Sequence, residues 1–278
     1  MTGGDEKVNA GQWLERVRET RPLVHNITNL VVTNVTANTL LALGASPVMA
    51  YAHEEVGDMT KTASALALDI GTLTPEVITA MHLAGISANA AGVPIVFDPV
   101  GVGATPYRNH VCADITSSLK LTVLRGNAGE IGVLVGAGGE VRGVDSVGVS
   151  ADLPAAMRKY AREHKTVVVA TGELDYVTDG DTIWQLANGH PLLATITGSG
   201  CSLTGVIGAF IGTVPRGGST LGLYAEAVVA AITCFNVAGE HAAEVASGPG
   251  TFQAALFDSL YHLTASDVNA AAKVSELG

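Results

Sequence analysis

Residues 195–202 read Thr-Ile-Thr-Gly-Ser-Gly-Cys-Ser and lead into an apolar run. Because residues 202–212 have the composition of a buried helix, the glycines lie at its amino end. Free N–H groups and the helix dipole favour an anion such as phosphate there. The same field is expected to lower the pKa of the Cys201 thiol and to favour the thiolate. We name Gly198, Ser199 and Gly200 the glycine turn. On its own, this segment is equally typical of a plain loop before a core helix.

Strand-like and helix-like segments alternate along most of the chain. The predicted strands cover residues 22–25, 45–51, 65–70, 94–98, 121–124 and 166–170, with a hairpin at 175–184 that turns at Asp179-Gly180. The predicted helices cover residues 12–19, 30–43, 75–91, 110–118, 127–135, 153–164 and 202–212, the last being one of three apolar helices in the C-terminal third. This order predicts an α/β fold with a mostly parallel central sheet and helices on both faces.

Capping residues and composition indicate where the second helix and the strand after it begin and end. The segment at 26–29 (Asn-Ile-Thr-Asn) offers N-caps for the second helix, which Gly44 is expected to end. Residues 45–51 are apolar enough to predict a buried strand. Since no repeat, low-complexity stretch or linker divides the chain, we expect one domain over residues 1–278, with residues 1–10 as a loose tail.

Composition and charge narrow the class of protein. The hydrophobic fraction of 47% and the charged fraction of 15% are typical of a globular protein with a large core. The net charge is −11 without any basic block, so no nucleic-acid partner is expected. Three widely spaced cysteines without a Cys-x-x-Cys motif favour a reducing compartment. No signal peptide is recognisable, and no uncharged apolar stretch reaches the ~18 residues of a membrane span, so we expect a cytoplasmic protein.

Four chemically informative residues lie at the ends of predicted strands: Met49, Asp98, Arg125 and Thr171. The glycine turn leads into a helix of the same sheet region. In open α/β sheets, ligands bind beyond the carboxyl ends of the strands. We therefore expect these residues to share one site.

Acidic and basic side chains at two strand ends indicate phosphate chemistry. Asp98 enters a glycine-rich turn at 99–104, an arrangement that suits a Mg²⁺ ion that keeps most of its waters and bridges phosphates. Glu130 follows Asn127 by three residues at a helix start, a spacing that also fits a capping box. Beside Asp98, a shared role toward metal and phosphate is the better interpretation. Arg125 is typical of either a bidentate phosphate contact or a surface salt bridge.

Other enzyme classes lack their signals here. The eight histidines show no zinc-ligand spacing, and His25, before a strand-to-helix turn, is expected to pack structurally. The chain has neither a Gly-x-Ser-x-Gly nucleophile motif nor the Gly-Lys-Ser/Thr of a Walker loop.

Four motifs together resemble those of hydroxyethylthiazole kinases. They are Val24–Asn29, Asp98–Ala104, Arg125–Glu130 and Thr197–Cys201. The likeness keeps order and spacing over roughly residues 12–265. It implies a ribokinase-like fold and phosphorylation of the hydroxyl of 4-methyl-5-(2-hydroxyethyl)thiazole by ATP and Mg²⁺, in thiamine salvage. It also implies a homotrimer with active sites at the subunit interfaces.

The resemblance also implies roles for individual residues. The residues that it assigns to the thiazole are Met49, Gly198 and Asn29, the last from a neighbouring subunit. Those that it assigns to ATP are Arg125 and Thr171, and those assigned to magnesium are Asp98 and Glu130. Cys201 is the implied catalytic residue, at a position where the wider superfamily usually has an aspartate base.

Three alternatives remain at this point. One is an ATP-dependent dehydratase of hydrated nicotinamide nucleotides, which shares this kind of fold but is expected to carry an aspartate at position 201. Another is a ribokinase-like kinase of a different small alcohol. The third is a catalytically silent nucleotide-binding trimer, which the two carboxylates and the glycine turn disfavour.

Overall fold

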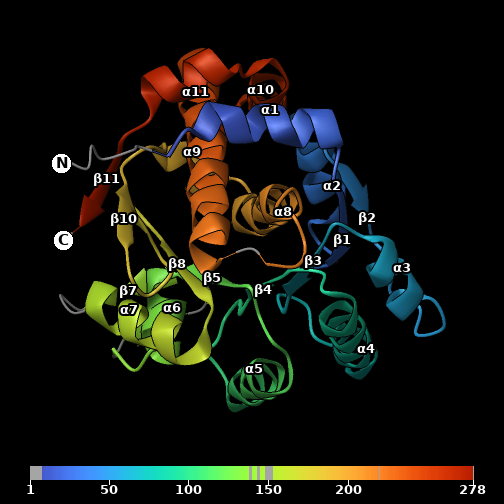
Figure 1. Ribbon diagram of the computed structural model, residues 1–278. Helices are drawn as coiled ribbons and strands as arrows, with labels where there is room; N and C mark the ends of the chain where they lie inside the picture. Colours follow the sequence, from blue (N-terminus) through green and yellow to red (C-terminus); the bar gives the residue numbers. More distant parts are fainter. Residues whose placement is uncertain (1–7, 138–139, 143–144, 148–152, 219, 278) are drawn as a thin grey trace.

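A nine-stranded sheet runs through the centre of the protein (Figure 1). The computed structural model describes residues 8–137, 140–142, 145–147, 153–218 and 220–277. The parallel strands are, in spatial order, β2 (Ser46–Val48), β1 (Leu23–Ile27), β3 (Ala65–Asp69), β4 (Ile95–Asp98), β5 (Val123–Asn127) and β8 (Val167–Thr171). The sheet continues through antiparallel β9 (Asp175–Thr178), β10 (Ile183–Leu186) and β11 (Val274–Leu277). Strands β6 (Glu140–Arg142) and β7 (Asp145–Val147) form a separate antiparallel pair.

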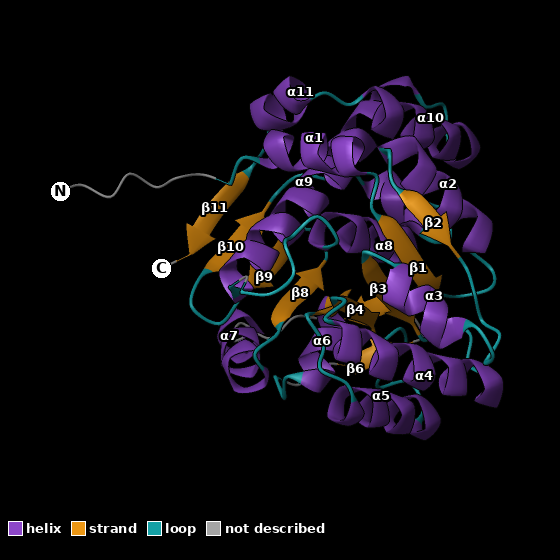
Figure 2. Cartoon of the chain, turned by 45° about the vertical axis from the view of Figure 1, so that its right-hand side comes forward, coloured by secondary structure: helices purple, strands orange, loops and turns teal. Residues whose placement is uncertain are grey.

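Helices cover both faces of this sheet, as Figures 1 and 2 show. One layer contains α1 (Ala10–Thr20), α2 (Thr33–Leu43), α8 (Ser199–Ile211), α9 (Leu221–Val245), α10 (Pro249–His262) and α11 (Ala265–Ala271). The other contains α3 (Val56–Thr62), α4 (Pro75–Ala91), α5 (Pro106–Ser118), α6 (Ala128–Leu134) and α7 (Leu153–His164). The predicted α/β class, with helices on both faces of a mostly parallel sheet, is confirmed.

Apolar side chains form one cluster on each face of the sheet, and α9 lies within the first. By length and composition alone, α9 is the one helix in the described part of the chain that is able to cross a membrane. However, 72% of its most apolar 18-residue window is buried inside the protein. Its hydrophobicity is therefore explained by its place in the core.

Helix α8 packs closely on the sheet because it presents glycines to the strands. It contacts β1, β3 and β4 on one side and α9 on another (Figure 2). A Cβ at Gly208 would lie 2.9 Å from Val24 Cγ1, and one at Gly205 would lie 3.3 Å from Asn26 Oδ1. The missing side chains let the helix axis approach the sheet, so that the first turn of α8 reaches the carboxyl ends of the strands.

Several predicted bounds agree with the structure. Helices α4 and α7 have the predicted bounds, and Gly44 ends α2 with a φ of 106°. The hairpin from β9 to β10 turns at Asp179-Gly180, where Gly180 has a φ of 98°. Helix α5 begins at Pro106 instead of 110, because the Thr105 side chain accepts a hydrogen bond from the Arg108 N–H and Pro106 takes the first helical position.

Two local predictions are wrong. Residues 26–29 do not cap α2, which follows Val32 without a side-chain capping bond. Asn26 instead belongs to β1, where its side chain donates to the Val24 carbonyl. Residues 45–51 do not form a buried strand, because β2 covers only Ser46–Val48 and is half-buried at the edge of the sheet. The sequence patterns also missed α3, α11, β6, β7 and β11, all of which have seven residues or fewer.

We expect Gly11→Ala to destabilise the protein, although alanine is the better helix former. A Cβ at Gly11 would lie 2.5 Å from the carbonyl oxygen and 2.8 Å from the Cα of Ala265, so the backbones of α1 and α11 would have to separate. Overpacking of this kind costs about 1–3 kcal/mol, which is measurable as a lower denaturant midpoint.

Gly250→Ala is the matched control. Gly250 also stands second in its helix, but a Cβ there would meet nothing within 4 Å. We expect its midpoint to stay the same or to rise slightly. Equal losses in the two variants would contradict the proposed clash.

Candidate functional site

The glycine turn begins α8 and lies over the ends of the parallel strands. Gly198 is the N-cap and has a φ of 85°, which favours glycine. A Cβ at Gly198 would also lie 2.6 Å from Val32 Cγ1, so the turn fits closely against the segment before α2. Thr204, in the second turn of α8, donates from its hydroxyl to Asp98 Oδ2 at 2.7 Å. This hydrogen bond fastens the amino end of α8 to the tip of β4.

A buried ion pair joins the tips of β4 and β5. Arg125 Nη1 lies 2.8 Å from Asp98 Oδ2, and the two residues are 7% and 1% exposed. Arg125 Nη2 also donates to Thr171 Oγ1 at 2.8 Å, which connects the pair to the end of β8. A Cβ at Gly200 would lie 3.1 Å from Arg125 Nη1, so the glycine lets the turn pass close to the guanidinium. Arg125 is therefore a buried link between three strand tips, and the surface salt bridge considered for it is wrong.

Two atoms of this pair have no hydrogen-bond partner although they are buried, namely Asp98 Oδ1 and Arg125 Nε. Buried polar atoms without partners are uncommon and require an explanation, such as a ligand or an ion. Asp98 Oδ1 has the chemistry of a ligand to a hard cation. In the described residues, no group of three or more His, Cys, Asp or Glu side chains is placed to hold a metal. A cation at Asp98 would therefore need water and ligand oxygens to complete its coordination, as Mg²⁺ usually does.

Glu130 holds the start of α6 and the turn after β4. It forms a capping box with Asn127, in which each side chain accepts from the other residue's N–H at 2.9 Å. Glu130 Oε1 also accepts from the Gly101 N–H at 2.7 Å. The capping interpretation is confirmed, and the carboxylate additionally fixes the glycine-rich turn. Burial and the nearby charge of Asp98 raise the pKa of Glu130 to about 7.

Asp69 is a functional candidate that the sequence patterns missed. It ends β3 and pairs in register with Asp98 on the neighbouring strand. Its carboxylate accepts from the Gly71 N–H at 2.6 Å and from Thr28 Oγ1 at 3.2 Å. Burial and the charge of Asp98 raise the pKa of Asp69 to about 6. The predicted strand at 65–70 already contained this residue, and an acidic side chain at the end of an apolar strand was the available signal.

The Cys201 thiol lies in the first turn of α8, where the Asp69 carboxylate is close enough to shift its pKa. Burial raises its pKa far above the ordinary value, and the charges of Asp69 and Asp98 raise it further. The expectation of a lowered pKa is therefore wrong. The field at the helix start is outweighed by loss of water and by two carboxylates. The group at this position is a protonated thiol.

The structure also places the other residues singled out in the sequence. Asn29 lies in the loop after β1, where its Oδ1 accepts from Thr72 Oγ1 at 2.6 Å and from the Val31 N–H at 3.0 Å. Met49 follows the edge strand β2, which two strands separate from β4, so its place in the same site stays a prediction. His25 is fully buried and contacts Thr60 Oγ1 and the Ala50 carbonyl, which confirms its packing role.

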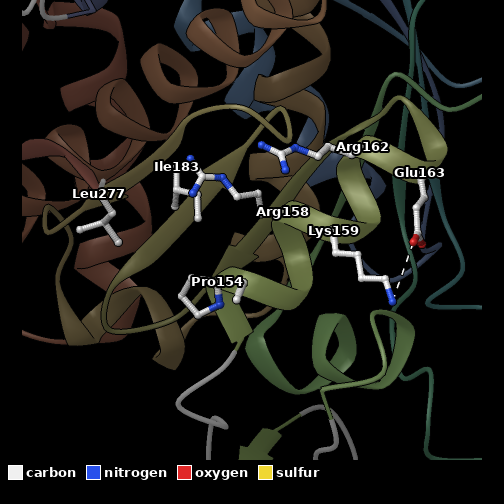
Figure 3. Close-up of a pocket in the computed structure, with 8 residues that line it drawn as sticks. Pro154, Arg158, Lys159, Arg162, Glu163, Ile183 and Leu277 are labelled. Atoms are coloured by element: carbon white, nitrogen blue, oxygen red, sulfur yellow. Dashed lines mark ion pairs between the residues drawn. The ribbon is translucent and has the colours of Figure 1, made fainter.

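A surface pocket of about 540 Å³ lies near the amino ends of the parallel strands, on the side of the sheet opposite to Asp98 (Figure 3). Its lining includes the start of β10 and the end of β11, which are both on the amino side of the parallel strands. Residues of the chain already hold the basic side chains of α7: Lys159 turns toward Glu163, while Arg158 and Arg162 lie on the other side (Figure 3) and both donate to Asp181. We therefore locate the candidate site at the carboxyl edge, around Asp98.

The chain is similar to known proteins along almost its whole length. The family model described as "Hydroxyethylthiazole kinase family" matches residues 14–266. A hydroxyethylthiazole kinase of Moorella thermoacetica is 50% identical over 260 residues, which cover 94% of this chain and 95% of that protein.

Solved structures agree with this relationship. A ribokinase-like superfamily protein from Enterococcus faecalis V583 has a TM-score of 0.58 at 13% identity, covering 94% of this chain and 90% of that one, which supports the fold alone. The structure of a hydroxyethylthiazole kinase protein from Pyrococcus horikoshii OT3 has a TM-score of 0.86 and 42% identity, covering 97% of this chain and 99% of that one. The expected ribokinase-like fold is thus confirmed, and the chain belongs to the hydroxyethylthiazole kinase family.

Proposed function

We propose that this protein transfers the γ-phosphoryl group of ATP to the hydroxyl of 4-methyl-5-(2-hydroxyethyl)thiazole, a step of thiamine salvage. The observation that carries the proposal is the glycine turn, whose helix start lies beside the buried Asp98–Arg125 pair. A helix start with free N–H groups stabilises phosphate, and a nearby carboxylate with an unpartnered oxygen suits its magnesium ion. Family membership favours this activity over the dehydratase, and over a kinase of a different alcohol.

Arg125 and Thr171 are the proposed ATP contacts. The N–H at Nε of Arg125 has no partner, so it is available to donate to a phosphate oxygen or to a water molecule bound to the phosphate. Thr171 holds the same guanidinium from the end of β8 and lies at the exposed side of the cluster, where it is half-buried. Together they form the side of the site that a nucleotide would enter.

Asp98 and Glu130 are the residues proposed to act on magnesium, and they differ in the oxygen atoms that they have free for it. Asp98 Oδ1 is an unpartnered buried oxygen and would bind the ion directly or through water. Both oxygens of Glu130 already accept backbone hydrogen bonds, so its contribution is negative charge and the position of the turn at Gly101. Magnesium at this place supplies charge neutralisation to the phosphates of ATP.

Met49, Gly198 and Asn29 are the proposed thiazole contacts, with Asn29 acting in a neighbouring subunit of a homotrimer. Leu30 and Val31 follow Asn29 directly and are 57% and 73% exposed in the single chain. Two adjacent exposed aliphatic side chains support burial of this loop against another copy. Sedimentation analysis tests the trimer. Three free cysteines support a cytoplasmic location, and the burial of α9 in the core supports the absence of a membrane partner. The net charge of −11 supports the absence of a nucleic-acid partner.

Cys201 and Asp69 are the proposed route for the proton of the alcohol. The alcohol oxygen forms a bond to the γ-phosphorus while the bond from that phosphorus to the leaving oxygen of ADP breaks. The hydroxyl proton passes to Cys201 Sγ, and the thiol proton passes to the Asp69 carboxylate. The phosphoryl transition state is loose, so this proton transfer contributes less than positioning and charge neutralisation.

The activity is tested with purified protein, ATP, magnesium and the thiazole alcohol. We expect ADP and the phosphorylated thiazole in equal amounts, and no ADP above background with the ethylthiazole that lacks the hydroxyl. Asp98→Asn removes the charge paired with Arg125, and we expect it to lower turnover by about 10²-fold or more. Equal ADP release with both thiazoles would refute the proposed acceptor.

The proton route predicts a non-additive pair of variants. Cys201→Ala is expected to lower kcat by about 10²-fold, the lower end of general-base assistance, because a thiol is a modest base. Asp69→Asn is expected to lower kcat similarly, and the double variant to be no slower than the slower single variant. Unchanged kcat in Cys201→Ala, or fully additive losses, would rule out the route. Cys112→Ala, on the opposite face of the sheet, is the control for removal of a buried thiol.

The raised pKa values predict how magnesium acts at different pH. Asp69 and Glu130 bind protons in the folded protein at a pH where the unfolded chain has lost them, so stability without metal falls as the pH rises from about 5 to about 8. A divalent ion offsets the carboxylate charge, and we expect magnesium to raise the melting temperature more at about pH 8 than at about pH 5. Glu130→Gln should reduce that difference. Equal shifts at both pH values would contradict a role of these carboxylates.

A further inference from the structure

The segment between β8 and β9 is closed by one buried carboxylate. Gly172 follows Thr171, and its N–H donates to Asp175 Oδ1 at 2.9 Å. The side chain of Asp175 is 4% exposed, although its residue begins a strand at the carboxyl edge of the sheet. The turn at 172–175 therefore depends on a side chain inside the protein and not on one at its surface.

The other oxygen of Asp175 is held from α9. Asn236 Nδ2 donates to Asp175 Oδ2 at 2.7 Å and to the Asn188 carbonyl at 2.9 Å. Asn236 is a buried polar residue in the middle of α9, most of whose buried residues are apolar, so its burial requires hydrogen-bond partners. Its two hydrogen bonds meet this requirement, and they fix the end of β8 and the segment after β10 to the rigid core helix.

Only an ionised carboxylate satisfies both of these donors. The Gly172 N–H and the Asn236 amide each need an acceptor, and a carboxylate offers two oxygens. An asparagine at position 175 has a single oxygen, so one of its own N–H groups would face a donor. Burial raises the pKa of Asp175 to about 6, which means that keeping this carboxylate ionised inside the protein costs free energy.

A chain of contacts leads from this pair to the Asp98 cluster. Asp175 holds Gly172, and the adjacent Thr171 hydroxyl donates to the Gly126 carbonyl at 3.2 Å and accepts from Arg125 Nη2. We propose that Asp175 and Asn236 are positioning residues for the nucleotide: they fix Thr171–Gly172 and, through Thr171, the guanidinium of Arg125. The inference rests on the function proposed above, in which Arg125 and Thr171 contact ATP.

The same polar network offers a matched control. Glu240, one turn after Asn236 on α9, accepts from the Gly189 N–H at 3.0 Å and pairs with Lys273 at 3.0 Å. Asn188 joins the two parts, since it accepts from the Lys273 N–H and donates to Glu240. Glu240 therefore fastens the segment before β11, and no described bond runs from it to Gly172.

The experiment compares Asp175→Asn, Asn236→Ala and Glu240→Gln with the wild-type protein. The measured quantities are the Kd of a non-hydrolysable ATP analogue with magnesium, by titration calorimetry, and kcat and KM for ATP and for the thiazole alcohol. We expect Asp175→Asn and Asn236→Ala to weaken the analogue about tenfold and to raise KM for ATP similarly, because small displacements at a site have large effects. KM for the alcohol should stay within about twofold. Glu240→Gln should leave every constant within about twofold while it lowers the melting temperature.

Each outcome separates the alternatives. If Asp175→Asn binds the analogue as tightly as the wild type, or if Glu240→Gln weakens it equally, the inference is overturned. Asn236→Ala decides the matter if Asp175→Asn does not fold, because it removes the same hydrogen bond from the other side. If the wild-type protein phosphorylates no thiazole alcohol, the proposed acceptor is wrong, while the analogue titrations still test the positioning role.

Discussion

The burial of Asp98 is the constraint on which the rest of the site depends. Its carboxylate accepts from Arg125 and Thr204 through one oxygen, while the other oxygen has no protein partner. Asp69 and Glu130 are two more buried carboxylates, and the charge of Asp98 raises the pKa of each. In the described residues, Arg125 is the one buried guanidinium that can balance these charges. A cluster of this composition is stable only with protons or an added cation, which links the fold of this edge of the sheet to the chemistry proposed for it.

The long elements were predictable because their signals are local. Helix α4 is bounded by the Thr74 cap and by Gly92, and α7 has one apolar face, while the alternation of strands and helices determines the class of sheet. The short elements α3, α11, β6, β7 and β11 were not predictable, because three to seven residues carry too little periodicity. Tertiary contacts decide whether such elements form. The N-cap expected within residues 26–29 failed for the same reason: β1 extends through Ile27 because it pairs with β3, and this pairing outweighs the local preference of Asn26.

The candidate site was only partly predictable. Strand ends correctly brought together Asp98, Arg125, Thr171 and the glycine turn, because parallel strands bring their carboxyl ends to one edge. The protonation state of Cys201 was not predictable from its place in the helix, since burial and Asp69 reverse the direction of the pKa shift. Asp69, Thr204 and Asp175 were missed because their importance comes from partners that are distant in sequence.

The protonated state of Cys201 has a consequence for the redox behaviour of the protein. Oxidants such as peroxides react with the thiolate, and a cysteine that keeps its proton is a poor target for them. A sulfur at this position therefore combines the proposed proton transfer with resistance to sulfenic acid formation. The protein keeps a thiol beside its proposed reaction centre without acquiring the sensitivity of a redox sensor.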